Sequence, residues 1–274
     1  MEIGINSAAV KEFCSSGAIS AKDVDLIEIS LAEQDFLASE ERLTETAREV
    51  KEIHDVKYTV HAPYQNSPVE HLRINFAEIN ERNTKLMEKV LEICNRIDAE
   101  CVVVHGGDAL NGKALSNVIE NLKVICDTAD KYGINVVIEN VFTSEKGIKR
   151  VGETPEELLY IAEKVSKDNL GINIDVGHAF ISSFIHGIQI EDYFKILGDY
   201  IVHLHVHNNH GLHGNPWDEH LPLFSGLIDY TNLRNLLKSR NVVLEVKNGS
   251  KEEIRASLDF LRVRSVRPKV NYII

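Results

Sequence analysis

The chain has 274 residues and a formal net charge of −12; 43% of its residues are hydrophobic and 26% are charged. This balance is typical of a globular protein with a sizeable core and excludes a disordered chain. The acidic charge argues against a general nucleic-acid coat protein, and no stretch resembles a signal peptide or a membrane-spanning helix. We therefore expect a cytoplasmic protein with no membrane partner, and no sequence feature indicates a protein partner.

Short apolar runs rich in Val and Ile alternate with longer amphipathic stretches along the chain. This alternation is expected when parallel strands are joined by crossover helices. We count eight such runs, each followed by a helical pattern: Glu2–Asn6, Val24–Ser30, Val56–His61, Glu100–His105, Ile134–Glu139, Leu170–Asp175, Tyr200–His207 and Asn241–Lys247. Eight units of this kind predict a closed α/β structure, a (β/α)8 TIM barrel, that forms a single domain over residues 1–274.

An open doubly wound sheet is the main alternative architecture. It is disfavoured because no Gly-x-Gly-x-x-Gly motif follows the first strand and no linker rich in Pro, Gly or Ser divides the chain. The helix after the fifth strand has the clearest local signals. Thr154 is a capping hydroxyl, Pro155 occupies the first helical position and Glu157 the third, which predicts a helix from there to about Ser166.

The polar residues that close the apolar runs are the candidates for chemistry, because barrel active sites lie at the carboxyl ends of the strands. One such residue alone would more often be a capping or hydrogen-bonded group. Here six consecutive strands end in or near a metal-ligand type: His61, His105, Glu139, Asp175, His205 and Glu245. Converging charges would repel one another without cations, and imidazole mixed with carboxylate suits zinc first and manganese second.

Two loop motifs extend this set. In Asp175-Val176-Gly177-His178, a carboxylate and an imidazole can reach neighbouring ions from one turn. In Asp218-Glu219-His220, residues two apart share a face of an extended segment, so Asp218 and His220 could bind one ion.

The remaining histidines have less specific roles. His203 is expected to be a hydrogen-bonded barrel residue, because only one or two of the three imidazoles along the seventh strand can reach a common site. Loop positions near a substrate are expected for His207, His210 and His213, and surface positions for His54, His71 and His186.

These motifs resemble the xylose-isomerase-like barrel superfamily and, within it, endonuclease IV, the zinc-dependent apurinic/apyrimidinic endonuclease. The resemblance covers nearly the whole chain. It is carried by His61-Ala-Pro-Tyr64, Val104-His105-Gly106-Gly107, Ile138-Glu139-Asn140, Ile174-Asp175-Val176-Gly177-His178, His205-Val206-His207-Asn208, Asp218-Glu219-His220 and Leu244-Glu245.

The resemblance implies a centre of up to three Zn²⁺ ions. One ion would be held by His61, His105 and Glu139, a second by Glu139, Asp175, His205 and Glu245, and a third by His178, Asp218 and His220. Glu139 and Glu245 would be the catalytic carboxylates, and Tyr64 and His207 would contact the substrate. The implied reaction is hydrolysis of a phosphodiester at abasic sites in DNA, a repair reaction in which metals polarise the phosphate and supply hydroxide.

Several segments depart from the endonuclease IV pattern. The first strand reads Gly4-Ile5-Asn6-Ser7 in place of Gly-x-His-x-Ser, and the segment Leu31–Glu41, where that family has a basic DNA-binding loop, contains no Arg or Lys. Gln65 follows Tyr64 where an apolar wedge would unstack bases, and Leu223-Phe224-Ser225-Gly226 replaces Leu-Gly-Glu-Gly.

Two other functions therefore compete with DNA cleavage. One is isomerisation or epimerisation of a sugar or sugar phosphate, with Glu139 and Glu245 as proton-transfer groups on either side of a metal-chelated enediolate; Glu28 in the second strand and the acidic surface favour it. The other is a noncatalytic metal-binding scaffold, whose ligands would leave no open coordination position.

Overall fold

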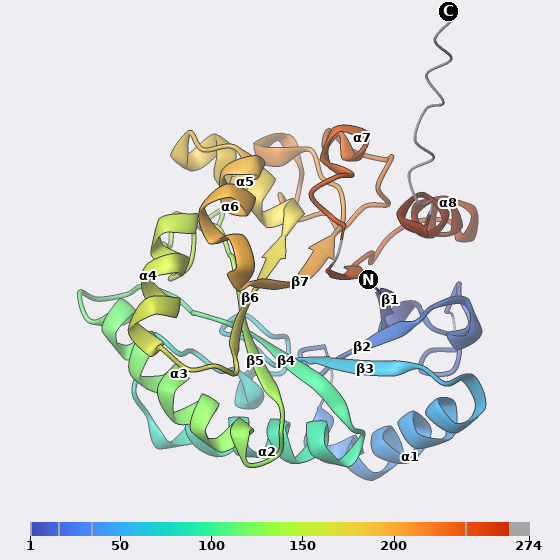
Figure 1. Cartoon of the computed structure of the whole chain (residues 1–274), viewed down its shortest axis with the longest axis horizontal. Coiled ribbons are helices and arrows are strands. Elements are labelled where there is room, and N and C mark those ends of the chain that lie inside the picture. The colour runs from blue at the N-terminus through green and yellow to red at the C-terminus, as the bar shows by residue number, and fades with distance from the viewer. Residues whose placement is uncertain (1, 16, 34, 239, 263–274) are drawn as a thin grey trace, which may run out of the picture.

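Eight parallel strands form a closed barrel in the computed structural model, which describes residues 2–262 except 16, 34 and 239 (Figure 1). β1 pairs with both β2 and β8, which closes the sheet. The strands are β1 (Ile3–Asn6), β2 (Leu26–Ser30), β3 (Lys57–His61), β4 (Ala99–His105), β5 (Asn135–Glu139), β6 (Leu170–Asp175), β7 (Ile201–Val206) and β8 (Asn241–Leu244). The predicted barrel is confirmed; of the predicted domain, residues 263–274 lie outside the described part.

The strands are buried on both faces, which explains their near-continuous Val and Ile content. Every residue of β6, for example, is buried. β7 and β8 are shorter than predicted and end at Val206 and Leu244.

The helices surround the barrel (Figure 1). They are α1 (Phe36–His54), α2 (Glu81–Arg96), α3 (Ala114–Asp130), α4 (Pro155–Val165), α5 (Val176–His186), α6 (Ile190–Leu197), α7 (Tyr230–Leu233) and α8 (Lys251–Arg262). The predicted helix over Thr154–Ser166 is confirmed as α4: the Thr154 hydroxyl accepts a hydrogen bond from the Glu157 amide, and Ser166 ends the helix with a left-handed φ of 51°. No helix in the described ranges is long and apolar enough to cross a bilayer.

The prediction of a helix after every strand is wrong for β1. Two short 3-10 turns, η1 (Ser7–Ala9) and η2 (Ala21–Asp23), connect β1 to β2. Between them Val10 and Ile19 form an isolated parallel bridge, so the backbone hydrogen bonds of this connection go to the bridge and not to a helix. α8, from the other end of the sequence, contacts β1 instead.

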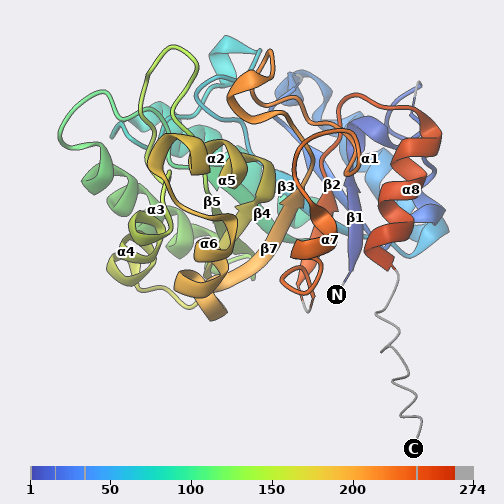
Figure 2. The ribbon, with the colours of Figure 1, turned by 90° about the horizontal axis from the view of Figure 1, so that it is seen from above.

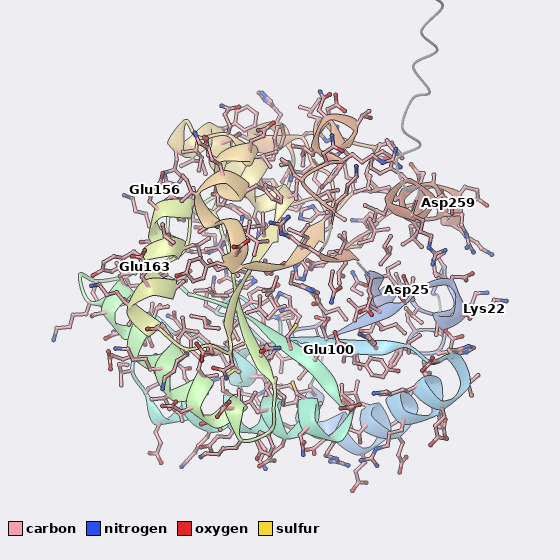
Figure 3. All side chains as sticks on the ribbon, viewed as in Figure 1. Lys22, Asp25, Glu100, Glu156, Glu163 and Asp259 are labelled. Atoms are coloured by element: carbon pink, nitrogen blue, oxygen red, sulfur yellow. The ribbon has the colours of Figure 1, made fainter. Side chains whose placement is uncertain are left out.

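The loops that follow the strands gather on one side of the barrel, at the top of Figure 2. Residues 62–80 follow β3, residues 140–154 follow β5 and residues 207–229 follow β7. The connection after β2 is much shorter, because α1 already begins at Phe36. Charged side chains such as Lys22, Glu156, Glu163 and Asp259 lie at the periphery, away from this mouth (Figure 3).

Candidate metal centre

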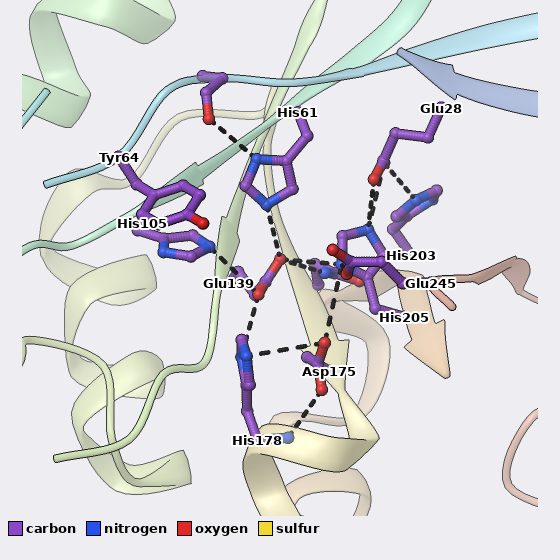
Figure 4. A network of polar contacts seen from close by, with 12 residues as sticks. Glu28, His61, Tyr64, His105, Glu139, Asp175, His178, His203, His205 and Glu245 are labelled. Atoms are coloured by element: carbon purple, nitrogen blue, oxygen red, sulfur yellow. Dashed lines mark hydrogen bonds and ion pairs between the residues drawn. The ribbon is translucent and has the colours of Figure 1, made fainter. Parts of the chain in front are cut away.

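Glu139, the last residue of β5, lies at the centre of a cluster of buried imidazoles and carboxylates (Figure 4). The strand register places it beside His105 on β4 and Asn173 on β6. One carboxylate oxygen, Oε1, lies 3.3 Å from His105 Nε2, and the other, Oε2, lies 3.6 Å from His61 Nε2. The first predicted ligand group is therefore assembled at the ends of three adjacent strands.

His205 on β7 joins Glu139 to the second group. Its Nδ1 lies 3.0 Å from Glu139 Oε2 and 3.0 Å from Glu245 Oε2. Asp175 Oδ2 is 4.0 Å from the same nitrogen. Glu139 thus contacts both groups, since Oε1 faces His105 while Oε2 lies between His61 and His205.

Glu28 contacts the ring nitrogen of His205 opposite the one that faces Glu139. Its Oε1 lies 3.0 Å from His205 Nε2, and Thr59 donates a 3.1 Å hydrogen bond to its Oε2. A carboxylate that accepts from Nε2 leaves Nδ1 of His205 for a metal and fixes the ring orientation. From the sequence, Glu28 was interpreted only as a residue that favours sugar chemistry. A single carboxylate within an apolar strand was the sequence feature that could have indicated its supporting role.

The third group is brought together by a helix and a loop. Asp175 caps α5 by accepting a 2.7 Å hydrogen bond from the His178 amide, which sets His178 in the first turn. The loop after β7 folds back through paired hydrogen bonds of 2.8 Å between Asn208 and Leu221. Asp218 Oδ2 then lies 3.4 Å from His178 Nε2 and 2.9 Å from His220 Nε2.

His207 directly follows β7, and its imidazole is fully buried. Its Nε2 lies 3.1 Å from Asp175 Oδ1 and 3.4 Å from Asp218 Oδ1, and its ring stacks on His220 with a centroid distance of 4.2 Å. The residue therefore faces the ligand cluster, and its contact with a substrate stays a prediction.

Three of the histidines are oriented by backbone carbonyls. The Nδ1 atoms of His61, His178 and His220 each lie 2.9 Å from a carbonyl oxygen, those of Ala62, Asn140 and Glu245 respectively. A ring that donates its Nδ1 proton to the backbone presents an unprotonated Nε2, which is the usual arrangement of metal-bound histidine.

The protein leaves many polar atoms of the cluster without partners. Buried atoms that lack a hydrogen bond include His105 Nε2, Glu139 Oε1, Asp175 Oδ2, His205 Nδ1, Asp218 Oδ1 and both ring nitrogens of His207. Unsatisfied buried groups cost free energy unless another ligand satisfies them. Divalent cations would satisfy these atoms and neutralise the carboxylates, so the donor set fits metal ions.

The electrostatics of the metal-free cluster point the same way. Burial opposes the charge of Glu139, but His205 and His105 outweigh it and hold the pKa of Glu139 well below its usual range. Burial likewise disfavours a charged His61, yet Glu139 raises the pKa of His61 to about 9. Without metal ions, a proton on His61 would balance the Glu139 charge, and metal binding would displace it.

A cavity of about 190 Å³ opens onto the cluster. Its walls include His61, His105, Glu139 and Glu245 together with Tyr64, Gln65, Arg150 and Lys247. The Tyr64 ring stacks on His105 at 4.7 Å, and burial raises the pKa of Tyr64 to about 12, so its hydroxyl stays protonated. Tyr64 therefore lines the cavity beside the cluster, and its contact with a substrate stays a prediction.

The other histidines take varied places. His203 is buried with its Nε2 3.3 Å from Glu28 Oε2. His210 is bound to Glu219 at 2.8 Å, His213 is exposed and His71 is largely exposed. His54 and His186 are half-buried, and His186 Nε2 is 2.9 Å from Glu153.

A closed parallel barrel with histidines and carboxylates at its strand ends can be compared with known families. The model of the family described as "Xylose isomerase-like TIM barrel" matches residues 18–264. The chain belongs to this family. Members of the superfamily are enzymes, and they include epimerases, isomerases and endonucleases.

Individual relatives point in more than one direction. The chain is 30% identical to the uncharacterised protein MJ1311 of Methanocaldococcus jannaschii over 226 residues, which span 78% of this chain and 72% of that protein. It is 24% identical to a probable endonuclease 4 of Mycoplasmoides gallisepticum over 68% of this chain and 61% of that protein. Among solved structures, a D-tagatose 3-epimerase-like protein superposes with a TM-score of 0.70, at 27% identity and over 95% of this chain and 98% of that one.

Proposed function

We propose that the protein is a metal-dependent phosphodiester hydrolase of the endonuclease 4 type, acting on DNA at abasic sites. The observation that supports the proposal is that the nine predicted ligands lie in one cluster of contacts. By the resemblance, a simpler sugar epimerase of the superfamily would need only Glu139, Asp175, His205 and Glu245. Zn²⁺ is the expected metal, with Mn²⁺ as the alternative, because the donors mix imidazole and carboxylate.

The first two ligand groups would provide the reaction centre. When bound there, divalent ions supply Lewis-acid activation of a phosphate and lower the pKa of water. Glu139 keeps the two groups together, since its oxygens face His105 on one side and His205 on the other. Glu245 contacts the same His205 nitrogen as Glu139 and lines the cavity, where it can accept a proton from an attacking water.

Donors on the cavity wall fit an anionic substrate. Although burial opposes its charge, Tyr64, Glu245 and Glu33 raise the pKa of Lys247, so the ammonium stays charged beside the ligands. Arg150 is held by Asp108 at 3.4 Å and lies over the Phe142 ring at 5.4 Å. Lys247, Arg150 and the Tyr64 hydroxyl can each donate a hydrogen bond to a phosphate oxygen. Hydrogen bonds to an ionised acceptor are shorter and stronger than neutral ones.

The route to DNA differs from the family's pattern. The short connection between β2 and α1 offers no long basic loop, so contacts to a duplex must come from the loops after β3, β5 and β7. The loop after β5 carries Lys146, Lys149 and Arg150, and Lys146 and Arg150 line an adjoining hollow. This loop is the candidate phosphate-backbone contact.

The test is incision of a labelled duplex that contains one abasic site, with Zn²⁺ or Mn²⁺ supplied. We expect cleavage on the 5′ side of the site by the wild-type chain, no cleavage of the intact duplex, and loss of activity in Glu139→Gln. Glu163→Gln is the matched control, because this exposed carboxylate on α4 lies far from the mouth (Figure 3). Equal activities of wild type and Glu139→Gln would refute the proposal.

A metal-dependent sugar or sugar-phosphate epimerase is the second candidate. The likeness to the D-tagatose 3-epimerase-like structure favours it, as does the placement of Glu139 and Glu245, each with an oxygen 3.0 Å from His205 Nδ1. Two carboxylates at one metal position are suited to proton transfer on either face of an enediolate. Deuterium incorporation from D₂O next to the carbonyl of a ketose or its phosphate would support this candidate, and its absence across a panel would exclude it.

A further inference from the structure

His207 is a buried imidazole that belongs to none of the three predicted ligand groups. Its side chain is fully buried, yet neither ring nitrogen makes a hydrogen bond. Leaving such a group unsatisfied is unfavourable unless another ligand satisfies it. Its Nε2 points between Asp175 and Asp218, at 3.1 Å and 3.4 Å.

Gly177 makes room for this ring. A Cβ atom at position 177 would lie 2.0 Å from His207 Cε1, so any larger residue would push the imidazole out of place. Gly177 is in the first turn of α5, next to the ligand His178. The approach of His207 to the cluster therefore requires a residue without a side chain at position 177.

His207 belongs to two possible ligand groups, one with Asp175 and His178 and one with Asp218 and His220, and Asp218 is the carboxylate with fewer other contacts to serve. Asp175 Oδ1 already caps α5, and its Oδ2 belongs to the group of Glu139 and His205. His207, Asp218 and His220 each offer a ligand atom within 4.8 Å of one another. His178 Nε2 approaches the same Asp218 carboxylate from the other side, at 3.4 Å.

His220 is held in place at a conformational cost. Its φ of 49° is in the left-handed region, which non-glycine residues rarely adopt. Such strain persists where the surrounding structure enforces it, and it clusters at functional sites. Here it directs His220 Nε2 to within 2.9 Å of Asp218 and lets the His220 ring stack on His207.

We infer that His207 is the fourth protein ligand of the third ion, completing a closed shell with His178, Asp218 and His220. Four protein ligands around zinc are typical of structural sites, whereas catalytic sites keep a position open. The third ion would then fix the loop of residues 207–229 against α5, and the open coordination positions would belong to the first two groups. This inference rests on the proposed metal centre but not on the identity of the substrate.

The experiment counts metal ions per chain and measures the affinity of each. Wild type, His207→Gln and His213→Gln are stripped with chelator, titrated with Zn²⁺ and analysed by equilibrium dialysis with elemental analysis. Glutamine can still donate a hydrogen bond to Asp175 but is a poor zinc ligand. In His207→Gln we expect the affinity for one Zn²⁺ ion to fall by at least about 100-fold, since even supporting partners of ligands contribute about 10–100-fold to metal affinity. The exposed His213→Gln should match wild type.

Two further measurements keep the test independent of folding. Gly177→Ala leaves His207 in the sequence but displaces its ring, so it should weaken the same ion. In the wild-type chain loaded with Co²⁺, one ion should give the intense visible absorption of four-coordinate cobalt, and that band should be lost in His207→Gln. Unchanged affinity for every ion in His207→Gln, or a wild-type chain without a four-coordinate cobalt, would overturn the inference. A failure to cleave abasic DNA would leave it standing.

Discussion

The two sides of the ligand cluster are built differently, although both use histidine and carboxylate. The pocket side, comprising His61, His105 and Glu139, lines the cavity, and the Tyr64 ring stacks on His105 there; His178, Asp218 and His220 of the loop side line the same cavity. The loop side, comprising His178, His207, Asp218 and His220, is packed around one carboxylate with a fully buried imidazole behind it. The difference between the two sides is this extra imidazole: as a fourth ligand, His207 would close the coordination shell of the loop side, whereas the pocket side has three candidate ligands.

Removal of the bridging carboxylate should have the largest effect, because Glu139 serves two groups at once. In Glu139→Gln the polarisation supplied by both neighbouring ions is impaired, which should lower kcat by at least about 10³-fold, equivalent to several kcal/mol. Single-turnover cleavage of the abasic duplex measures this. A change of less than tenfold would show that the pocket side is not the reaction site.

The pH dependence of folding should separate metal-free from metal-loaded protein. The pKa of His61 is raised from 6.5 to about 9 by Glu139, so this pair stabilises the metal-free fold fully below about pH 6.5. That stabilisation, on the order of 3 kcal/mol, is lost as the pH rises through about 9.

Zn²⁺ should remove this loss, because a metal ion replaces the proton between His61 and Glu139. Urea denaturation at pH 6 and pH 9, with zinc or with chelator, provides the comparison. We expect the urea midpoint of the chelated chain to be lower at pH 9 than at pH 6, and that of the zinc-loaded chain to be the same at both pH values. Parallel curves in the two states would contradict the assignment of His61 as a ligand.

Lys247 should matter to the pocket side alone. Lys247→Met removes a charged donor beside Glu245 and should lower kcat/KM for a phosphate-bearing substrate by about 10–100-fold, the value of a hydrogen bond to a charged group. Zinc stoichiometry should be unchanged. Steady-state kinetics with dialysis on the same sample test both statements, and loss of an ion from this variant would blur the division between the two sides.

Tyr64→Phe should give the smallest effect. The ring that covers His105 is kept and only the hydroxyl is lost, so kcat/KM should fall by about tenfold, as for one neutral hydrogen bond to the substrate. Tyr64→Ala should cost more, because it also uncovers His105. If Tyr64→Phe were as impaired as Tyr64→Ala, the hydroxyl rather than the ring would be the main contribution.

Much of this arrangement followed from the sequence alone. Parallel strands in a barrel have their carboxyl ends on one face, so a polar residue that closes each apolar run must join the others there. That rule placed His61, His105, Glu139 and Asp175 without knowledge of any contact. The eight alternating strand and helix patterns likewise predicted the closed barrel, although no helix follows β1.

Only the tertiary structure decided how the ligands divide. The inward position of His207 depends on the clearance at Gly177 and on a loop that returns through Asn208 and Leu221, and neither is a local property of the residues around 207. The pairing of Glu28 with His205 joins residues 177 positions apart in the chain. Local patterns specify which residues reach the mouth of the barrel, whereas side-chain packing between distant segments specifies which of them face the same ion.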